Sequence, residues 1–325
     1  MANLFGTAFG VGLLLAVSIG ALAAEAGVTN PQIEALPWVK FLGFRCVHSG
    51  GRITDEALKV GLKPTVAFAN WGMPPKLRHP FVNHRGKKTL SASIFCHVNF
   101  NYEPFREWWR KFVPEVAERY KGKAVLAYKP FNEFHYGFLF DYSEPTLRRY
   151  RSWLKSRYGS IEALNEAWGT NYRDFSEVEP PREVPTEEVA NWIEWREFTT
   201  WTFSDFFAET RRLIKSVDED ALVGSNFWPF PDPVSTGWNP WELARSQDFL
   251  AYDIYAVGRW EWMGLALDEV RSAARCAGRE AWLLEFMGGP NNWRPKVTAD
   301  DIWLEAHLAL SRDIRCIIFY MWRPA

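Results

Sequence analysis

Ala281-Trp-Leu-Leu-Glu285-Phe-Met-Gly-Gly289 is the stretch of the chain that decides the fold. It is continuously apolar up to Glu285 and lacks the alternation of a half-exposed strand. Continuous apolar runs are typical of parallel strands that are covered by helices on both faces. A second run of this kind, Ala124-Val-Leu-Ala-Tyr-Lys-Pro-Phe-Asn-Glu133, also ends in a glutamate. The two runs predict a parallel sheet in which two strands end in a carboxylate.

Further apolar runs of strand length follow the same pattern; they span residues 44–48, 64–69, 221–227, 249–255 and 316–322. Amphipathic segments lie between the runs, and residues 105–120 and 201–216 carry apolar side chains at helical spacing. Repeated strand–helix units predict an α/β fold with a parallel sheet. A closed (β/α)8 TIM barrel needs eight strands. Before residue 40, Phe9–Val17 is apolar enough to supply the missing strand, so we expect a single barrel domain over residues 1–325.

Residues 1–24 allow a second interpretation, in which they form a signal peptide. The apolar segment ends in Ala-Leu-Ala-Ala24, which resembles a cleavage site, but residues 1–9 contain no lysine or arginine. The segment is also short for a membrane span. Because cleavage after Ala24 would remove the expected first strand and helix, we favour a cytoplasmic protein over a secreted one.

The longest connection in the predicted barrel follows the strand at residues 124–129. Ser143 and Gly159 mark the two ends of one helix, and Ser160 caps a second, shorter helix. Loops that follow barrel strands gather at the catalytic face. We therefore expect residues 134–200 to form an insertion at this rim, although a surface insertion without a role in function fits the same pattern.

Composition excludes several classes of protein. Lys and Arg number 38 against 39 Asp and Glu, and this balance without a basic block argues against nucleic-acid binding. The four cysteines show no CxxC spacing and no histidine at ligand distance, so we expect free thiols rather than a zinc site. Aromatic residues make up 16% of the chain, with 18 Trp. Such an excess suits either a sugar-binding cleft or a large aromatic core.

Glu133 and Glu285 are the candidate catalytic residues. A carboxylate that follows a buried strand carries a desolvation cost unless something compensates it. At the carboxyl end of a barrel strand, catalysis is the usual reason for such a residue, although either glutamate alone could be a salt-bridged strand end. Two such carboxylates suit glycosidic bond cleavage, which needs one protonated acid and one ionised nucleophile or base.

The chain resembles the catalytic domain of glycoside hydrolase family 42, the β-galactosidases within the clan A of retaining barrel enzymes. The most specific matches are Tyr150-Arg-Ser-Trp-Leu-Lys-Ser-Arg-Tyr-Gly159 and Leu164-Asn-Glu-Ala-Trp-Gly-Thr170. Phe131-Asn-Glu133-Phe, Asp248-Phe-Leu-Ala-Tyr-Asp-Ile-Tyr255 and Phe319-Tyr-Met-Trp-Arg323 also match in order. The resemblance covers about residues 60–325 and implies a retaining mechanism on a carbohydrate substrate, without a cofactor.

Carried over residue by residue, the resemblance implies that Glu133 is the acid/base and Glu285 the nucleophile. Asn132 would hydrogen-bond the sugar 2-hydroxyl, a contact that strengthens in the transition state. Tyr255 would orient the nucleophile. The family's zinc-binding cysteine cluster is absent after Glu133, so we expect no catalytic metal.

Aromatic and histidine side chains complete the candidate site. The resemblance implies a stacking platform at Trp322, and Trp293 either lines the pocket or packs structurally. The roles of His48, His97 and His135 stay open between sugar contacts and structure. The sequence also leaves open whether copies of the chain form a homo-oligomer.

The expected activity is that of a retaining β-glycosidase of the β-galactosidase type. The alternatives within the clan are a glucosidase, a mannosidase or an endo-glycanase. A non-catalytic sugar-binding barrel is a further alternative, but it has no need for two strand-end carboxylates. A metal-dependent hydrolase is disfavoured because no HxH pair occurs at a strand end.

Overall fold

The computed structural model describes residues 25–68, 73–93, 95–136, 141–187, 189–230, 236–256, 258–288 and 297–322. Its centre is an eight-stranded parallel sheet in the order β6-β3-β2-β1-β10-β9-β8-β7. The strands are β1 (Glu25–Thr29), β2 (Cys46–His48), β3 (Lys63–Ala67), β6 (Ala127–Lys129), β7 (Asn226–Phe227), β8 (Phe249–Ile254), β9 (Glu280–Met287) and β10 (Cys316–Tyr320). Parallel bridges from Tyr128 to Val223 and from Asn132 to Asn226 join the two edges of the sheet. The predicted (β/α)8 barrel is confirmed.

The first strand is Glu25–Thr29, and the prediction that Phe9–Val17 supplies it is wrong. β1 lies between β2 and β10, which is the place that the eighth strand had to fill. Phe9–Val17 lies outside the described residues. The sequence Glu-Ala-Gly-Val-Thr has a weak apolar signal because Val28 is its only large apolar residue. Close packing requires a small residue at Gly27, where a Cβ would lie 2.5 Å from the Cys46 carbonyl oxygen. Since β1 begins at Glu25, cleavage after Ala24 would leave all eight strands in place, and that argument against a signal peptide fails.

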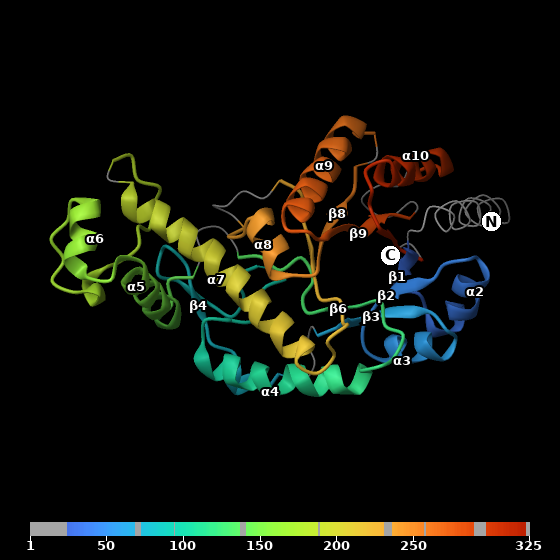
Figure 1. Ribbon diagram of the computed structural model, residues 1–325, viewed down its shortest axis with the longest axis horizontal. Helices are drawn as coiled ribbons and strands as arrows, with labels where there is room; N and C mark the ends of the chain where they lie inside the picture. The colour runs from blue at the N-terminus through green and yellow to red at the C-terminus, as the bar shows by residue number, and fades with distance from the viewer. Residues whose placement is uncertain are drawn as a thin grey trace.

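Helices lie around the barrel and in an arm that extends away from it (Figure 1). They are α2 (Leu36–Phe41), α3 (Arg52–Lys59), α4 (Glu103–Tyr120), α5 (Glu144–Tyr158), α6 (Ile161–Trp168), α7 (Ala190–Lys215), α8 (Pro240–Ser246), α9 (Trp260–Cys276) and α10 (Ala299–Leu310). Two predicted caps are confirmed, since Gly159 ends α5 and the Ser160 hydroxyl caps α6. Thr298 also forms a capping box with Asp301 before α10. Within the described residues, no helix has the length and apolar character needed to cross a membrane.

The long connection after β6 projects away from the barrel. Figure 1 shows α5, α6 and the first turns of α7 at the end of the molecule farthest from β1. The buried Asp141 carboxylate ties the base of this arm together, because it accepts hydrogen bonds from Asn99, Ser143, Thr146 and the Val82 backbone. Val82 belongs to a small hairpin of β4 (Phe81–Val82) and β5 (Lys88–Thr89), which the sequence did not predict. The insertion therefore follows the expected strand but extends outward.

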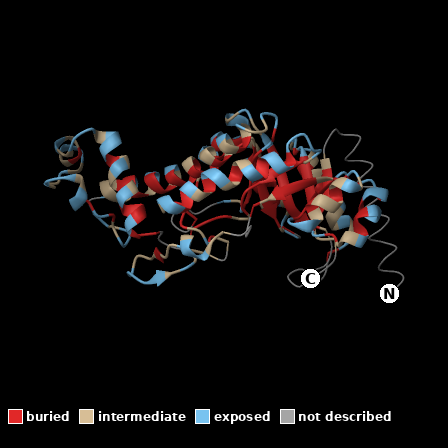
Figure 2. Cartoon of the chain, turned by 90° about the horizontal axis from the view of Figure 1, so that it is seen from below, coloured by how far each residue is buried: buried red, intermediate tan, exposed pale blue. Residues whose placement is uncertain are grey.

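The lower end of the barrel lumen, at the amino ends of the strands, is apolar and tightly filled. Its cluster comprises Cys46, Leu126, Ala127, Phe249, Ala251, Trp282, Leu284, Cys316 and Ile318. The rings of Phe249 and Trp282 stack with centroids 3.8 Å apart. In Figure 2 the strands of the barrel are coloured almost entirely as buried. The four cysteines are free thiols as predicted, three of them buried and Cys276 exposed.

Candidate active site

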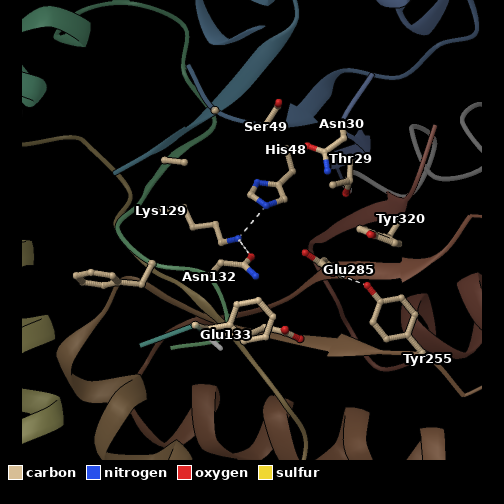
Figure 3. A pocket seen from close by; sticks show the side chains of 14 residues that line it. Thr29, Asn30, His48, Ser49, Lys129, Asn132, Glu133, Tyr255, Glu285 and Tyr320 are labelled. Atoms are coloured by element: carbon tan, nitrogen blue, oxygen red, sulfur yellow. Dashed lines mark hydrogen bonds between the residues drawn. The ribbon is translucent and has the colours of Figure 1, made fainter. Parts of the chain in front are cut away.

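A cavity of about 380 Å³ opens at the upper end of the barrel, where the strands have their carboxyl ends. The described residues that line it are Thr29, Asn30, His48, Ser49, Gly50, Ala67, Phe95, Lys129, Phe131, Asn132, Glu133, Tyr255, Glu285 and Tyr320. Figure 3 shows that polar side chains from β2, β6, β9 and the ends of β1 and β8 converge on this space. A cavity of this size at this end of a barrel is a typical small-ligand site.

Glu285 reaches the cavity through an irregularity in β9. Ala251 pairs with Trp282 and Tyr252 with Leu283, but Asp253 pairs with Glu285. Leu284 is therefore an extra residue, and β9 has a β-bulge at this point. Strand alternation would otherwise place Glu285 on the outer face with Leu283, because Trp282 and Leu284 face the lumen. The bulge turns Glu285 inward beside Asp253.

Burial and two specific contacts set the charge of Glu285. The residue is 8% exposed, and its carboxylate accepts a hydrogen bond from the Tyr255 hydroxyl. Desolvation raises the pKa of Glu285 above its ordinary value, while the Lys129 charge and the Tyr255 hydrogen bond act in the opposite direction. The nearby charge of Glu133 raises it further. The site thus holds a carboxylate whose ionised form depends on its immediate partners.

Glu133 lies just beyond β6 in a strained backbone conformation. Its φ is +40°, a region that costs a non-glycine residue of the order of 1–3 kcal/mol. The side chain is half-buried, and the Trp228 indole N–H donates to its Oε1. The His135 Nδ1 lies 2.7 Å from the Glu133 carbonyl oxygen. Glu133 is therefore held from both its side chain and its backbone, and its carboxyl group stays accessible from the cavity.

Asp253 is a third carboxyl group that the sequence analysis did not identify. Single oxygens of Glu133, Asp253 and Glu285 all lie within 4.8 Å of one another. Asp253 is 3% exposed, and desolvation followed by the charges of Glu285 and Glu133 raises its pKa well above the ordinary value. The Asn226 amide donates to one of its oxygens. Three carboxyl groups this close cannot all be ionised without counter-charge, and the group could also attract a cation.

Lys129 supplies a positive charge beside these carboxyl groups. It points into the lumen from the end of β6 and is 2% exposed. Its ammonium lies 2.8 Å from His48 Nε2 and 2.5 Å from Asn132 Oδ1. Burial lowers the pKa of Lys129, whereas Glu285, Asp253 and Glu133 act to raise it. The lysine is therefore part of the same electrostatic unit as the carboxylates.

The structure brings together four of the six residues singled out as catalytic or substrate-binding. Asn132, Glu133, Tyr255 and Glu285 line the cavity. Trp322 instead packs on the core next to it, with its backbone N–H donating to the Thr29 carbonyl. Trp293 lies outside the described residues.

The three candidate histidines differ in their position relative to the cavity. His48 lines the cavity, and His135 packs against Trp228 with ring centroids 4.4 Å apart. His97 is exposed and does not line the cavity. Lys129 and Asp253 were missed. Each lies two residues after an alanine that the structure places in the lumen, Ala127 or Ala251, so strand alternation places both inside the barrel once that face is known.

Comparison with known proteins identifies the family of the chain. Residues 52–325 match the sequence model of the glycoside hydrolase family 42, described as beta-galactosidase. The chain belongs to this family. The beta-galactosidase BgaA of Thermus sp. is 29% identical over 304 residues, covering 84% of this chain and 46% of that protein. The beta-galactosidase BbgII of Bifidobacterium bifidum is 26% identical, covering 94% of this chain and 47% of that protein.

The fold of this family 42 member also matches solved structures. The beta-galactosidase of the Antarctic haloarchaeon Halorubrum lacusprofundi superimposes with a TM-score of 0.78 at 22% identity, covering 92% of this chain and 53% of that one. At this identity the match concerns the fold alone. The chain spans about half the length of the curated relatives that it matches.

Proposed function

We propose that this family 42 chain is a retaining β-glycosidase of the β-galactosidase type. The observation that carries the proposal is the approach of Glu133, which follows β6, and Glu285, which lies on β9; they have oxygens within 4.8 Å of each other. Retaining enzymes hold their two carboxyl groups about 5–5.5 Å apart, whereas inverting enzymes leave about 6.5–9.5 Å for a water. The names of the curated relatives support a β-galactoside as substrate.

In this mechanism Glu285 attacks the anomeric carbon and Glu133 protonates the leaving oxygen. The Tyr255 hydroxyl holds Glu285 in place, and Lys129 favours its ionised form. The Trp228 indole fixes the Glu133 carboxyl group at the opposite side of the cavity. Once the aglycone has left, Glu133 acts as the base that activates water against the glycosyl-enzyme. Asn132 lines the same cavity and donates to the sugar 2-hydroxyl.

A panel of nitrophenyl glycosides tests the proposal on the wild type, Glu285→Ala and Glu133→Ala. The wild type should hydrolyse the β-galactoside fastest and release product with retained anomeric configuration, followed by NMR. Glu285→Ala should lose about four orders of magnitude or more in kcat/KM, the scale seen when a covalent nucleophile is removed. Glu133→Ala should keep more activity on activated aryl glycosides and form the β-glycosyl azide when azide is added.

Glu280→Ala is the matched control, because Glu280 lies at the lower end of the same strand and contacts Trp282 instead of the cavity. It should behave as the wild type does. Inverted product, or an active Glu285→Ala variant, would overturn the mechanism. Preference for a glucoside or mannoside would keep the mechanism and assign another clan A substrate.

A further inference from the structure

We propose that Lys129 is a positioning residue, which fixes the Asn132 amide with its NH2 group toward the sugar and provides the counter-charge for Glu285. The inference rests on the proposed glycosidase function and deepens it. This lysine lies within the apolar run before Glu133 and is not among the site residues that the family resemblance implies.

The first step concerns the orientation of the Asn132 amide. A lysine ammonium can only donate hydrogen bonds, so the Asn132 atom 2.5 Å from it must be the carbonyl oxygen. The Asn226 amide donates to the same oxygen at 3.1 Å. With its oxygen held by two donors, Asn132 turns its nitrogen toward the space between Glu133 and Glu285 (Figure 3). The sugar hydroxyl at this position therefore meets a donor whose geometry is set before binding.

The second step concerns what holds Lys129. Because the ammonium donates to His48 Nε2, that nitrogen must be the acceptor, and Nδ1 carries the proton. His48 Nδ1 lies 2.8 Å from the Thr65 hydroxyl oxygen, which can in turn donate to the Ser49 carbonyl at 3.5 Å. Burial and the Lys129 charge lower the pKa of His48, so the imidazole stays neutral. A neutral histidine and a threonine thus anchor the lysine from β2 and β3.

The third step concerns charge. Among the described residues that line the cavity, Lys129 is the only lysine or arginine. The titratable groups around it, by element, are His48 on β2, Glu133 after β6, Asp253 on β8, Tyr255 after β8, Glu285 on β9 and Tyr320 on β10. Lys129 lowers the pKa of Glu285 against the effect of burial. Removing it therefore reduces the ionised fraction of the nucleophile at low pH.

Two variants separate the two roles. Lys129→Met keeps the length and apolar stem but removes both donor and charge, whereas Lys129→Gln keeps an amide donor without the charge. Lys63→Met is the control, because Lys63 pairs with Glu25 at the lower end of the barrel, 2.6 Å apart, and lies outside the cavity lining. Each variant is assayed on an aryl β-glycoside and on its 2-deoxy counterpart, with kcat and KM measured from acidic to alkaline pH.

For Lys129→Met we expect a loss in kcat/KM of about 10²–10³-fold on the parent glycoside, the usual scale for one preorganised donor. The loss on the 2-deoxy substrate should be no more than about tenfold, since the contact with the 2-hydroxyl is already missing. The acid limb of the pH profile should move to higher pH. Lys129→Gln should regain much of the discrimination between the two substrates, but its acid limb should stay displaced. Lys63→Met should match the wild type.

Equal losses on both substrates with an unmoved acid limb would overturn the inference and leave Lys129 a purely structural role. Full activity of folded Lys129→Met would do the same. If Lys129→Met does not fold, the Gln variant decides, because an unmoved acid limb in it contradicts the counter-charge role. A wild type inactive on every glycoside would instead refute the proposed function.

Discussion

The lower end of the barrel lumen is apolar and filled, whereas the upper end is polar and open, although the same strands line both. At the lower end, Phe249 and Trp282 stack across β8 and β9 with ring centroids 3.8 Å apart, within a cluster of buried apolar side chains. At the upper end, Asp253 and Glu285 follow on the same two strands and face a cavity of about 380 Å³. The two ends are a few residues apart along each strand, so this barrel separates stability from chemistry over a short distance.

The difference indicates that packing at the apolar end offsets the free energy lost by burying charged groups at the polar end. Glu285, Asp253 and Lys129 are nearly fully buried, and desolvation opposes the charged form of all three. Buried charge of this kind destabilises a fold unless its partners compensate it. The aromatic and aliphatic packing below provides no chemistry, and we expect it to supply the stability.

The largest effect on stability should follow from Trp282→Ala at the lower end. Trp282 is 3% exposed, and its removal leaves a cavity against Phe249 that the surrounding strands cannot fill. We expect a loss of about 3–5 kcal/mol in the free energy of unfolding, measured by urea denaturation. Trp303→Ala is the control, because Trp303 is 51% exposed on α10 and should cost far less. Equal costs would show that the lower end is not the stabilising region.

An intermediate effect should follow from Gly27→Ala, which overfills the same end. The added Cβ would lie 2.6 Å from the Cys46 sulfur and 2.5 Å from the Cys46 carbonyl oxygen, so β1 or β2 must shift. We expect a loss of about 1–3 kcal/mol by the same measurement. At Gly50, on the upper side, the nearest atom to an added Cβ is 3.5 Å away, and Gly50→Ala should be milder. A neutral Gly27→Ala would mean that the lower end has room to spare.

The smallest effect should be a gain in stability from Glu285→Gln at the upper end. Burial raises the pKa of Glu285 in the folded chain, so the stability that its protonated form contributes is present below the unfolded pKa of about 4.3 and is lost as pH rises through the folded pKa. The Gln variant lacks this loss. Its advantage in unfolding free energy should grow from pH 4 to pH 8 and reach the order of 1 kcal/mol. Parallel pH curves for the two proteins would contradict this.

Much of the fold could be predicted from the sequence because buried parallel strands leave continuous apolar runs. The seven strands after residue 40 were found in this way, and so were Glu133 and Glu285 at the ends of two of them. β1 was missed because its interior positions must be small to fit against Cys46, and small residues give a weak apolar signal. Phe9–Val17 attracted the prediction by hydrophobicity alone.

The surroundings of the two glutamates could be predicted only in part. Asn132 and Tyr255 were identified through the family resemblance, and both line the cavity. The contact of Trp228 with Glu133 depends on how the chain leaves β7, which no local pattern reports. Lys129 was taken as the end of an apolar strand, since one charged residue in such a run does not reveal whether it faces the lumen or the helices.

Because of the bulge at Leu284, the direction of the Glu285 side chain depends on the number of residues in β9 as well as on their types. Insertions and deletions are usually absorbed in loops, where they change little beyond the surface. In this strand a gain or loss of one residue would exchange the two faces beyond that point and direct Glu285 into the helical layer. Related proteins could thus substitute many of these apolar residues and keep the catalytic site. They could not change the number of residues between Trp282 and Glu285.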